Sequence, residues 1–403
     1  MNTQEHRFPV DRDWRRRAEI YRYLEEIGQD LDLTEAQIEK ARREHDKLCN
    51  WLATALEPLL IEIIVYAHGS FALGTANKPL GRAEFDIDLI CLLKRGHAGL
   101  DPASIKRLIG NRLKESSEYR HILEEKKRCW RLNFPGDFHI DVAVTIPNPS
   151  CVNNGELVPD KALKAWHPTN PQGFKVLFEK RAALEPRFKR SFVGLSTVDA
   201  AAAQIEPFPE QSKLKGVLRR LVQLLKRHRD YHFLDIEQDV APISVIITTL
   251  AMRSYEHCVG WYTFGDELEL LVEVIRMMPH FIDTDTKDGR TTYAVWNETT
   301  IGENFADRWN AEPERVNAFY AWHKKALSDF EAVRDAVGLD AVIGGAREQF
   351  GHRVVDRVMA KRNKSVSDAR KSNGLLVAPA IGLTTSRAAS ASVSIPNNDF
   401  FGE

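Results

Sequence analysis

Two aspartates one residue apart, at the start of an apolar segment, constrain this chain most. Asp86 and Asp88 alternate with Phe85, Ile87 and Leu89, and alternation with a period of two is typical of a β-strand. On such a strand both carboxylates project from the same face and repel each other. A divalent cation held between them is a common way of balancing that charge. The pattern therefore predicts either a solvated pair on an edge strand or a metal site.

A glycine–serine pair precedes this strand. Gly69 and Ser70 lead into it through a loop that contains glycine and proline. A small hydroxyl and unhindered backbone N–H groups suit a bound phosphate, although such dipeptides also mark ordinary turns. The order of the two features, a Gly-Ser loop followed by an Asp-x-Asp strand, favours nucleotidyl transfer.

A third aspartate lies in a predicted hairpin. Segments 129–134 and 138–146 are strand-like and are separated by a short Pro-Gly-Asp turn, which indicates a β-hairpin. Asp141 interrupts the second, otherwise apolar strand, where an ionised carboxylate is costly to bury without a partner. A partly exposed aspartate at the hairpin edge is the alternative interpretation. With the upstream aspartate pair, Asp141 would complete the carboxylate set of a two-metal site.

These motifs resemble the DNA polymerase β-type nucleotidyltransferase superfamily and, within it, the bacterial cGAS/DncV-like nucleotidyltransferases (CD-NTases) of anti-phage signalling. The narrower resemblance rests on segments 166–174, 224–229 and 242–250, and it extends over roughly residues 10–360. It implies an α+β fold. A polymerase β-like core with a small mixed β-sheet and helices would be joined to a C-terminal all-helical lobe, and the two would enclose a nucleotide cleft.

The resemblance also implies roles for the three aspartates and the Gly-Ser loop. Asp86, Asp88 and Asp141 would hold two Mg²⁺ ions, for which Mn²⁺ could substitute. Gly69 and Ser70 would bind the triphosphate of the donor nucleotide.

Two further phosphate ligands are predicted from the helical region. In 213–230 an apolar stripe with helical spacing is flanked by basic residues, among them Lys226. By itself such a basic row is usually a solvated edge of the helix, but the resemblance implies that this helix faces the nucleotide cleft. It therefore makes Lys226 the candidate for binding the triphosphate, with Arg227 as the near alternative. Ser244 opens the next helix after a proline, either as a phosphate ligand at the helix N-terminus or as an N-cap.

The helical periodicity also suggests how the chain is divided. Thr34, with Gln37 three residues later, is a predicted N-cap. The sequence beyond 363 is rich in Ser, Ala, Thr and Asn, which indicates a flexible tail. The expected units are a nucleotidyltransferase core with N-terminal spine helices at 14–27 and 33–57 (1–205), a helical lobe (206–362) and the tail (363–403).

Composition excludes some partners. The 403 residues carry a net charge of −1, which argues against bulk binding of nucleic acid. The five cysteines are scattered without a C-x-x-C motif, as expected in a reducing cytosol and without a zinc ribbon. Since the animal DNA-sensing relative uses a zinc insertion, direct DNA sensing is not expected. No apolar window is long enough to span a membrane, so we expect a cytoplasmic protein.

The activity implied by the resemblance is the synthesis of a cyclic di- or trinucleotide messenger from purine nucleoside triphosphates, ATP and/or GTP, which a downstream effector would sense. The bases, the ring size, the 2′–5′ or 3′–5′ linkage, the activation signal and the oligomeric state are not readable from the sequence. A transferase acting on a small molecule, an RNA-tailing enzyme and a non-catalytic nucleotide-binding module share parts of the pattern. The long basic-helix lobe disfavours the first, and the net charge disfavours the second.

The extreme C-terminus is unusually aromatic. Residues 399–403 read Asp-Phe-Phe-Gly-Glu, and some CD-NTase systems resemble ubiquitin pathways in which a ligase joins the enzyme's C-terminus to a target. We therefore expect the tail to act as a conjugation handle. Whether Gly402 or Glu403 is the functional end stays open.

Overall fold

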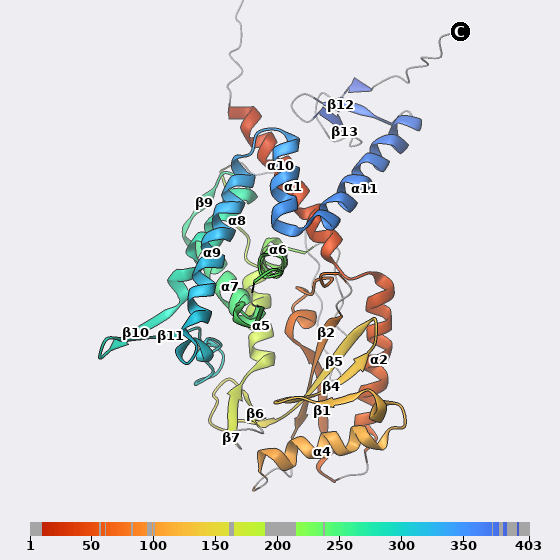
Figure 1. Ribbon diagram of the computed structural model, residues 1–403, viewed down its shortest axis with the longest axis vertical. Helices are drawn as coiled ribbons and strands as arrows, with labels where there is room; N and C mark the ends of the chain where they lie inside the picture. The colour runs from red at the N-terminus through yellow and green to blue at the C-terminus, as the bar shows by residue number, and fades with distance from the viewer. Residues whose placement is uncertain are drawn as a thin grey trace, which may run out of the picture.

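The chain folds into two lobes that follow one another along its long axis (Figure 1), and each has its own buried apolar core. One lobe is a β-sheet with its helices, and the other is built from helices. The computed structural model describes residues 10–55, 58–60, 62–81, 84–94, 99, 101–160, 165–189, 215–236, 238–372, 374–378, 382–384 and 393–394.

The sheet of the first lobe is mixed and has the order β1-β2-β5-β4-β3, with β6 paired to β5 and β7 paired to β6. The central pair β2 and β5 is parallel, whereas the other neighbouring strands are antiparallel. The strands are β1 (Ile63–His68), β2 (Phe85–Leu93), β3 (Leu123–Glu125), β4 (Cys129–Phe134), β5 (Phe138–Pro147), β6 (Glu156–Asp160) and β7 (Ala165–Thr169).

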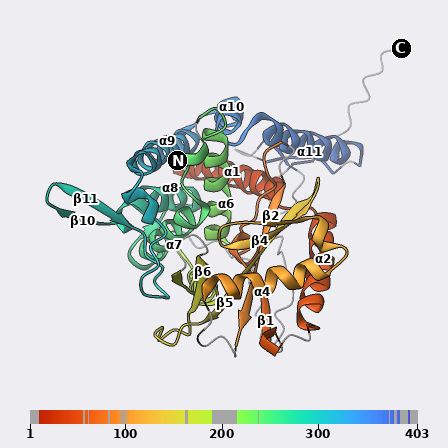
Figure 2. The same ribbon diagram turned by 60° about the horizontal axis from the view of Figure 1, so that its bottom comes forward.

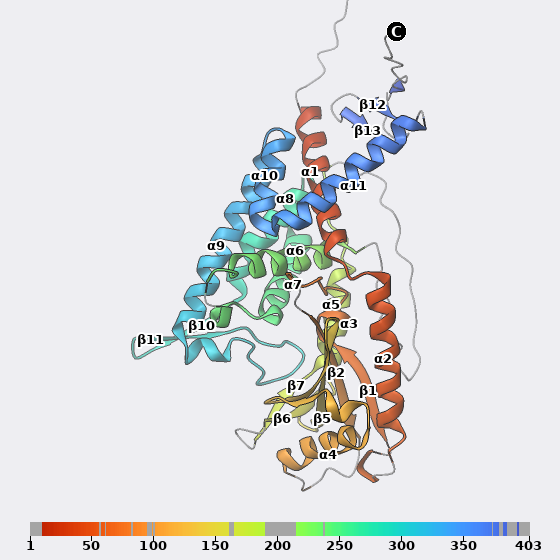
Figure 3. The same ribbon diagram turned by 45° about the vertical axis from the view of Figure 1, so that its right-hand side comes forward.

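The two faces of this sheet differ in chemistry. Along β2, Phe85, Ile87 and Leu89 are buried, while Asp86 is exposed and Asp88 is half-buried. The apolar side chains pack against α2 (Glu35–Ala53) and α4 (Pro102–Glu115) in one core cluster. Figure 3 shows α2 lying along the sheet. The acidic side chains therefore project from the face that these two helices do not cover.

The second lobe buries a larger apolar cluster around two central helices, α6 and α7. Both α6 and α7 are largely buried along their length. Figure 2, turned from the first view, shows the remaining helices of this lobe gathered around them. The helices are α1 (Val10–Leu31), α5 (Pro171–Ala182), α6 (Val217–His232), α7 (Ser244–Trp261), α8 (Glu267–Met277), α9 (Pro313–Asp335), α10 (Leu339–Phe350) and α11 (His352–Lys371).

The N-terminal helices belong to different lobes. Thr34 caps α2 through a complete capping box with Gln37, which confirms the predicted N-cap. The helical structure is interrupted just before Thr34, because α1 ends at Leu31. As a result α1 packs in the helical lobe, with Tyr23 and Ile27 in that core, and only α2 packs on the sheet. The two spine helices expected to join the nucleotidyltransferase core are thus divided between the lobes.

The C-terminal helix is longer than the sequence analysis expects. α11 continues to Lys371, beyond the limit at 362, and an ion pair between Lys364 and Asp368 supports its last turns. The residues proposed as a conjugation handle, including Gly402 and Glu403, lie outside the described residues.

Short elements complete the structure. The hairpin of β10 and β11 extends away from the helical lobe (Figure 1), and its strand β10 is exposed throughout. Among the described residues, no helix is both long and apolar enough to cross a membrane. The remaining elements are α3 (Gly69–Ala72), β8 (Arg187–Phe188), β9 (Thr263–Phe264), β10 (Asp283–Lys287), β11 (Arg290–Ala294), β12 (Leu376–Ala378), β13 (Gly382–Thr384), β14 (Val393–Ser394), η1 (Pro58–Leu60), η2 (Tyr119–His121), η3 (Gln238–Val240), η4 (Met278–Phe281) and η5 (Asp307–Asn310).

Candidate active site

The strand pairing brings the three aspartates together. In the parallel pair of β2 and β5, Asp88 lies opposite Asp141, and Asp86 lies opposite His139. Because the side chains of a sheet alternate between its faces, matching registers put Asp88 and Asp141 on the same face in adjacent strands. All three predicted aspartates line one cavity of about 400 Å³.

This cavity lies between the lobes and also contains the other predicted site residues. Gly69, Ser70, Lys226 and Ser244 line it together with the aspartates, whereas Arg227 does not. A larger cavity of about 720 Å³ opens between α1, α10 and α11, but none of the predicted site residues lines it. The complete lining of the smaller cavity is His68, Gly69, Ser70, Ala72, Leu73, Thr75, Asp86, Asp88, Asp141, Thr169, Asn170, Pro171, Phe174, Lys175, Lys226, Ser244, Val245, Thr248, Asn297, Glu303 and Phe305.

The Gly-Ser loop leaves β1 beside the aspartates. His68, the last residue of β1, pairs with Asp88 across the antiparallel strands. Gly69 then turns the chain with a φ of +65°, a conformation that residues with a side chain rarely adopt. Ser70 follows in the short helix α3, and its carbonyl accepts a hydrogen bond from the N–H of Thr75 at 2.9 Å. The loop thereby folds back on itself at the cavity wall.

Helix α6 holds the end of this loop in place. The Nζ of Lys226 donates to the carbonyl of Thr75 at 2.9 Å. One turn earlier, the side-chain amide of the fully buried Gln223 donates to the carbonyl of Ala76 at 2.8 Å. In return, the amide of Asn77 donates to the carbonyl of Gln223 at 2.9 Å. The loop after Ser70 is therefore fixed to α6 at three consecutive residues.

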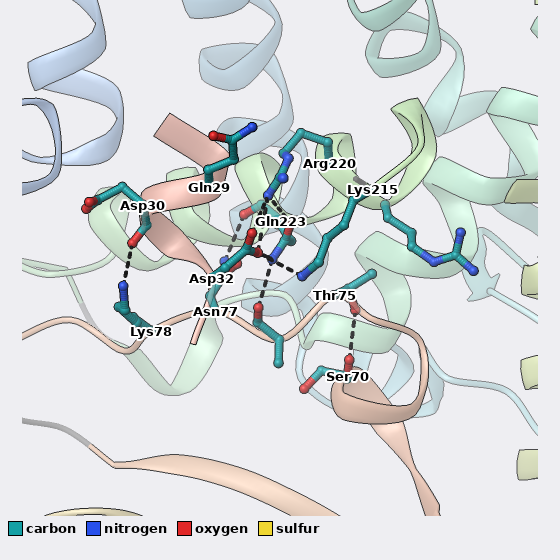
Figure 4. A network of polar contacts seen from close by, with 12 residues as sticks. Gln29, Asp30, Asp32, Ser70, Thr75, Asn77, Lys78, Lys215, Arg220 and Gln223 are labelled. Atoms are coloured by element: carbon teal, nitrogen blue, oxygen red, sulfur yellow. Dashed lines mark hydrogen bonds and ion pairs between the residues drawn. The ribbon is translucent and has the colours of Figure 1, made fainter. Parts of the chain in front are cut away.

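A charged network supports this attachment from α1 and its C-terminal end (Figure 4). Asp32 accepts hydrogen bonds from Lys215, Arg220 and Gln223. Next to it, the Nζ of Lys78 donates to the carbonyl of Asp30 at 3.0 Å. The position of the loop is thus coupled to both lobes.

Arg227 lies elsewhere. Its Nε donates to the carbonyl of Phe350, at the end of α10, at 3.1 Å. The neighbouring Lys226 points to the cavity, since consecutive residues on a helix face different directions. Between the two basic residues left open by the sequence, Lys226 is the one beside the aspartates.

Ser244 is the first residue of α7, and Ile243 occupies its N-cap position. The interpretation of Ser244 as an N-cap is therefore wrong, because the helix begins one residue earlier than that role requires. Its Oγ receives a hydrogen bond from Nη2 of Arg229 at 3.3 Å. Its proposed contact with phosphate stays a prediction.

Burial, together with neighbouring charges, shifts the pKa values of ionisable groups in the cavity. Burial, with the nearby charges of Asp141 and Asp86, raises the pKa of Asp88 to about 7. Burial also raises the pKa of Asp86, against the opposing effect of Arg131. On the cationic side, burial lowers the pKa of Lys226 to about 8. A carboxylate with a pKa this high is stabilised by additional positive charge, such as that of a metal ion.

Arg131 is a site residue that the sequence analysis missed. Its guanidinium binds Asp141 through two hydrogen bonds, Nε to Oδ1 and Nη2 to Oδ2, both of 2.7 Å. The same Nη2 lies 3.1 Å from Oδ1 of Asp86. The hairpin itself contains the signal, because pairing Phe134 with Phe138 places Arg131 opposite Asp141.

Within the described part of the chain, no three acidic, histidine or cysteine side chains already surround a single point where a metal ion could lie. Arg131 binds Asp141 and Asp86, so that oxygens of both carboxylates are directed toward its guanidinium. The donor chemistry nevertheless fits a hard divalent cation, since the carboxylates of Asp86, Asp88 and Asp141 face one cavity.

The far wall of the cavity is formed by α5 and by the loop between β11 and η5. Asn170, the N-cap of α5, donates its side-chain amide to the carbonyl of Thr299 at 2.9 Å. In the same loop, the amide of Asn297 donates to Oε2 of Glu303 at 2.7 Å. Phe174 and Phe305 meet edge to face, with ring centroids 5.8 Å apart. The segment 166–174 therefore anchors this wall.

Comparison with known proteins identifies the sheet lobe. Residues 65–145 match the family "Cyclic GMP-AMP synthase DncV-like, nucleotidyltransferase domain", and this range contains Gly69, Ser70 and the three aspartates. The chain is also similar to a c-di-GMP synthase of Roseivirga ehrenbergii. The two are 28% identical over 386 residues, which cover 94% of this chain and 96% of that protein.

Solved structures of CD-NTases share the two-lobed fold. The CdnG protein of Bradyrhizobium diazoefficiens, solved with GTP, aligns with a TM-score of 0.64 and 22% identity over 86% of this chain and 99% of CdnG. The CdnC protein of E. coli MS115-1, solved with ATP, aligns with a TM-score of 0.58 and 13% identity over 83% of this chain and 97% of CdnC. These matches confirm the fold expected from the sequence.

Proposed function

We propose that this chain, which resembles the bacterial cGAS/DncV-like nucleotidyltransferases, joins purine nucleoside triphosphates into a cyclic di- or trinucleotide and releases pyrophosphate. The observation that carries the proposal is the shared cavity, in which Asp86, Asp88 and Asp141 lie with Ser70 and Lys226. Carboxylates that bind metal ions and groups that bind phosphates are the two components that phosphoryl transfer requires in one place.

The three aspartates are the proposed ligands of the metal ions, for which we propose Mg²⁺, with Mn²⁺ as a substitute. When bound, such ions neutralise the charge of the triphosphate and make the attacking hydroxyl more acidic. Ser70 would donate its hydroxyl to a phosphate oxygen, and Lys226 would supply a positive charge from the opposite lobe. Attachment of the loop to α6 through Gln223 would keep the hydroxyl of Ser70 and the ammonium group of Lys226 in a fixed position relative to each other.

Guanosine and adenosine triphosphates are the proposed substrates. The relative from Roseivirga ehrenbergii is a c-di-GMP synthase, which favours GTP, and CdnC was solved with ATP, so both are to be tested. The aromatic pair Phe174 and Phe305 provides an apolar wall of the size and chemistry that a nucleobase contacts.

Pyrophosphate release tests the assignment of the aspartates. With Mg²⁺ and the four nucleoside triphosphates, the wild type is expected to release pyrophosphate. Asp88→Asn should reduce the rate at least about a hundredfold, because losing a metal ligand costs several kcal/mol of transition-state stabilisation. Asp137→Asn is a matched control, since Asp137 pairs with Lys40 in the turn between β4 and β5 and does not line the cavity. Retention of more than a hundredth of the wild-type rate by Asp88→Asn would refute the assignment.

The resemblance to the bacterial cGAS/DncV-like nucleotidyltransferases also supports a proposal about the setting in which the protein acts. We propose that the product is a messenger of a bacterial anti-phage (CBASS-type) system, made in the cytoplasm and sensed by an effector protein. We also propose that a ubiquitin-pathway-like ligase acts on the C-terminal tail, on the basis of its Phe-Phe-Gly sequence. Deletion of residues 394–403 should preserve pyrophosphate release and prevent covalent attachment when a cognate ligase and ATP are present. Covalent products that persist after the deletion would rule out this role.

A further inference from the structure

Arg131 occupies the position at which two of the proposed metal ligands converge. Its guanidinium uses Nε and Nη2 to hold both oxygens of Asp141 at 2.7 Å, and Nη2 also reaches Asp86 at 3.1 Å. A fork-like, two-bond contact of this kind is among the strongest that a carboxylate makes. The oxygens of these two aspartates are therefore directed toward an internal cation.

The pairing of the strands places the guanidinium of Arg131 beside these two aspartates. Arg131 lies opposite Asp141 in the antiparallel pair of β4 and β5, and Asp141 lies opposite Asp88 in the parallel pair of β5 and β2. The three residues thus form one row across three strands, on the face that projects away from α2 and α4. Lys226, which lines the cavity from the helical lobe, donates instead to the carbonyl of Thr75.

Arg131 and a metal ion compete for the same carboxylate oxygens. Mg²⁺ requires oxygens at about 2.0–2.1 Å in near-octahedral geometry, whereas the guanidinium already takes both oxygens of Asp141 in its own plane. Two cations sharing those oxygens would also repel each other.

We propose that Arg131 is a positioning residue that stands in for the divalent cation. It holds Asp141 and Asp86 together in the cation-free enzyme and is displaced from them when the cation binds. The inference rests on the proposed function, because the cation is the one that nucleotidyl transfer would use. The side chain of Arg131 is 23% exposed, so it is already in contact with solvent.

The displacement has two measurable consequences. Removal of the guanidinium removes a competitor, so the cation should bind more tightly. It also removes the charge that balances Asp86 and Asp141, so the cation-free protein should become less stable. A purely structural role for Arg131 would produce only the second consequence.

Binding of Mn²⁺, measured by electron paramagnetic resonance without nucleotide, separates these cases. Arg131→Gln should bind Mn²⁺ roughly tenfold or more tightly than the wild type, because the binding-competent state no longer competes with the internal ion pair. Its melting temperature in a chelator should fall and should recover when Mn²⁺ is added. Lys126→Gln is the control for lost charge. Lys126 lies in the sheet lobe, between β3 and β4, and it pairs with Glu124 away from the cavity.

Several outcomes decide the matter. Unchanged or weaker Mn²⁺ binding by Arg131→Gln, or an equal gain in Lys126→Gln, would overturn the inference. If Arg131→Gln does not fold, Arg131→Lys answers the same question, because lysine keeps the charge but cannot chelate both oxygens. It should also bind Mn²⁺ more tightly than the wild type. Tighter binding by the variants in a protein that releases no pyrophosphate would support the role of Arg131 and refute the proposed function.

Discussion

A methyl group placed on Gly69 would lie 2.1 Å from Oδ2 of Asp88, well inside van der Waals contact. The backbone of the Gly-Ser loop therefore runs directly against the central carboxylate of the site. Gly69 also adopts a φ of +65°. The glycine thus satisfies two requirements at once, the turn of the chain out of β1 and the close approach to Asp88.

A comparison of Gly69→Ala with Gly81→Ala should separate the effect of the positive φ from the effect of the close approach to Asp88. Both glycines have a φ of +65°, but a methyl group at Gly81 would meet no atom within 4 Å. Gly81→Ala should cost about 1–2 kcal/mol of unfolding free energy and leave pyrophosphate release unchanged. Gly69→Ala should cost more and reduce the rate at least about a hundredfold, because the carboxylate must move. Equal behaviour of the two variants in denaturation and rate measurements would contradict the close-approach argument.

The neighbouring residues Lys226 and Arg227 should differ in their effects on substrate binding. Lys226→Ala removes a cation from the cavity, so the KM for the nucleotide should rise by about tenfold or more, with a smaller decrease in kcat. Arg227→Ala removes the hydrogen bond to Phe350. It should lower the melting temperature and leave KM unchanged.

Steady-state kinetics with each nucleotide tests this pair of variants, and thermal unfolding verifies that both proteins fold. A raised KM in Arg227→Ala together with a normal KM in Lys226→Ala would show that the phosphate ligand lies one position along α6.

Asp30 predicts how stability depends on pH. Its carboxylate is buried and receives hydrogen bonds from Arg357 at 2.8 Å and Lys361 at 2.6 Å. Burial opposes ionisation, but these bonds outweigh it and hold the pKa of Asp30 below its ordinary value. A depressed pKa contributes stability above the unfolded-state pKa of about 4, and that contribution is lost as the pH falls through the folded-state value.

Asp30→Asn should therefore reduce the unfolding free energy by about 1–3 kcal/mol at pH 7. The difference from the wild type should stay constant to about pH 5 and shrink only below about pH 4. Urea denaturation at several pH values measures it. Asp368→Asn, which breaks an exposed ion pair with Lys364, should have a much smaller effect. A difference that grows on acidification would contradict the assignment.

Local sequence patterns predicted much of the sheet lobe. Alternation along β2 places Asp86 and Asp88 on one face, and the tight turn between β4 and β5 predicts their hairpin. The adjacency of Asp88 and Asp141 depends on the parallel pairing of β2 with β5, which is a long-range feature. The resemblance supplied it, since periodicity within a strand carries no information on its neighbours.

The remaining parts depend on contacts between distant segments. The far wall of the cavity joins Asn170 to Thr299 across a large separation in the chain, and neither residue has a pattern that indicates this contact. The sequence of α1 predicts an apolar face but not its partner. Its place in the helical lobe depends on the packing of that face against residues of distant helices. Arg131 differs from these, because the register of the predicted hairpin already places it opposite Asp141.

The identity of the phosphatase-resistant product tests the central claim most directly. The purified protein is incubated with Mg²⁺ and with GTP alone, ATP alone or both, treated with phosphatase, and analysed by thin-layer chromatography and mass spectrometry. The account predicts a resistant product with the mass of a cyclic di- or trinucleotide of purines, and its absence in Asp88→Asn. Linear or singly modified products only, in these three incubations and in one with all four nucleoside triphosphates, would contradict it.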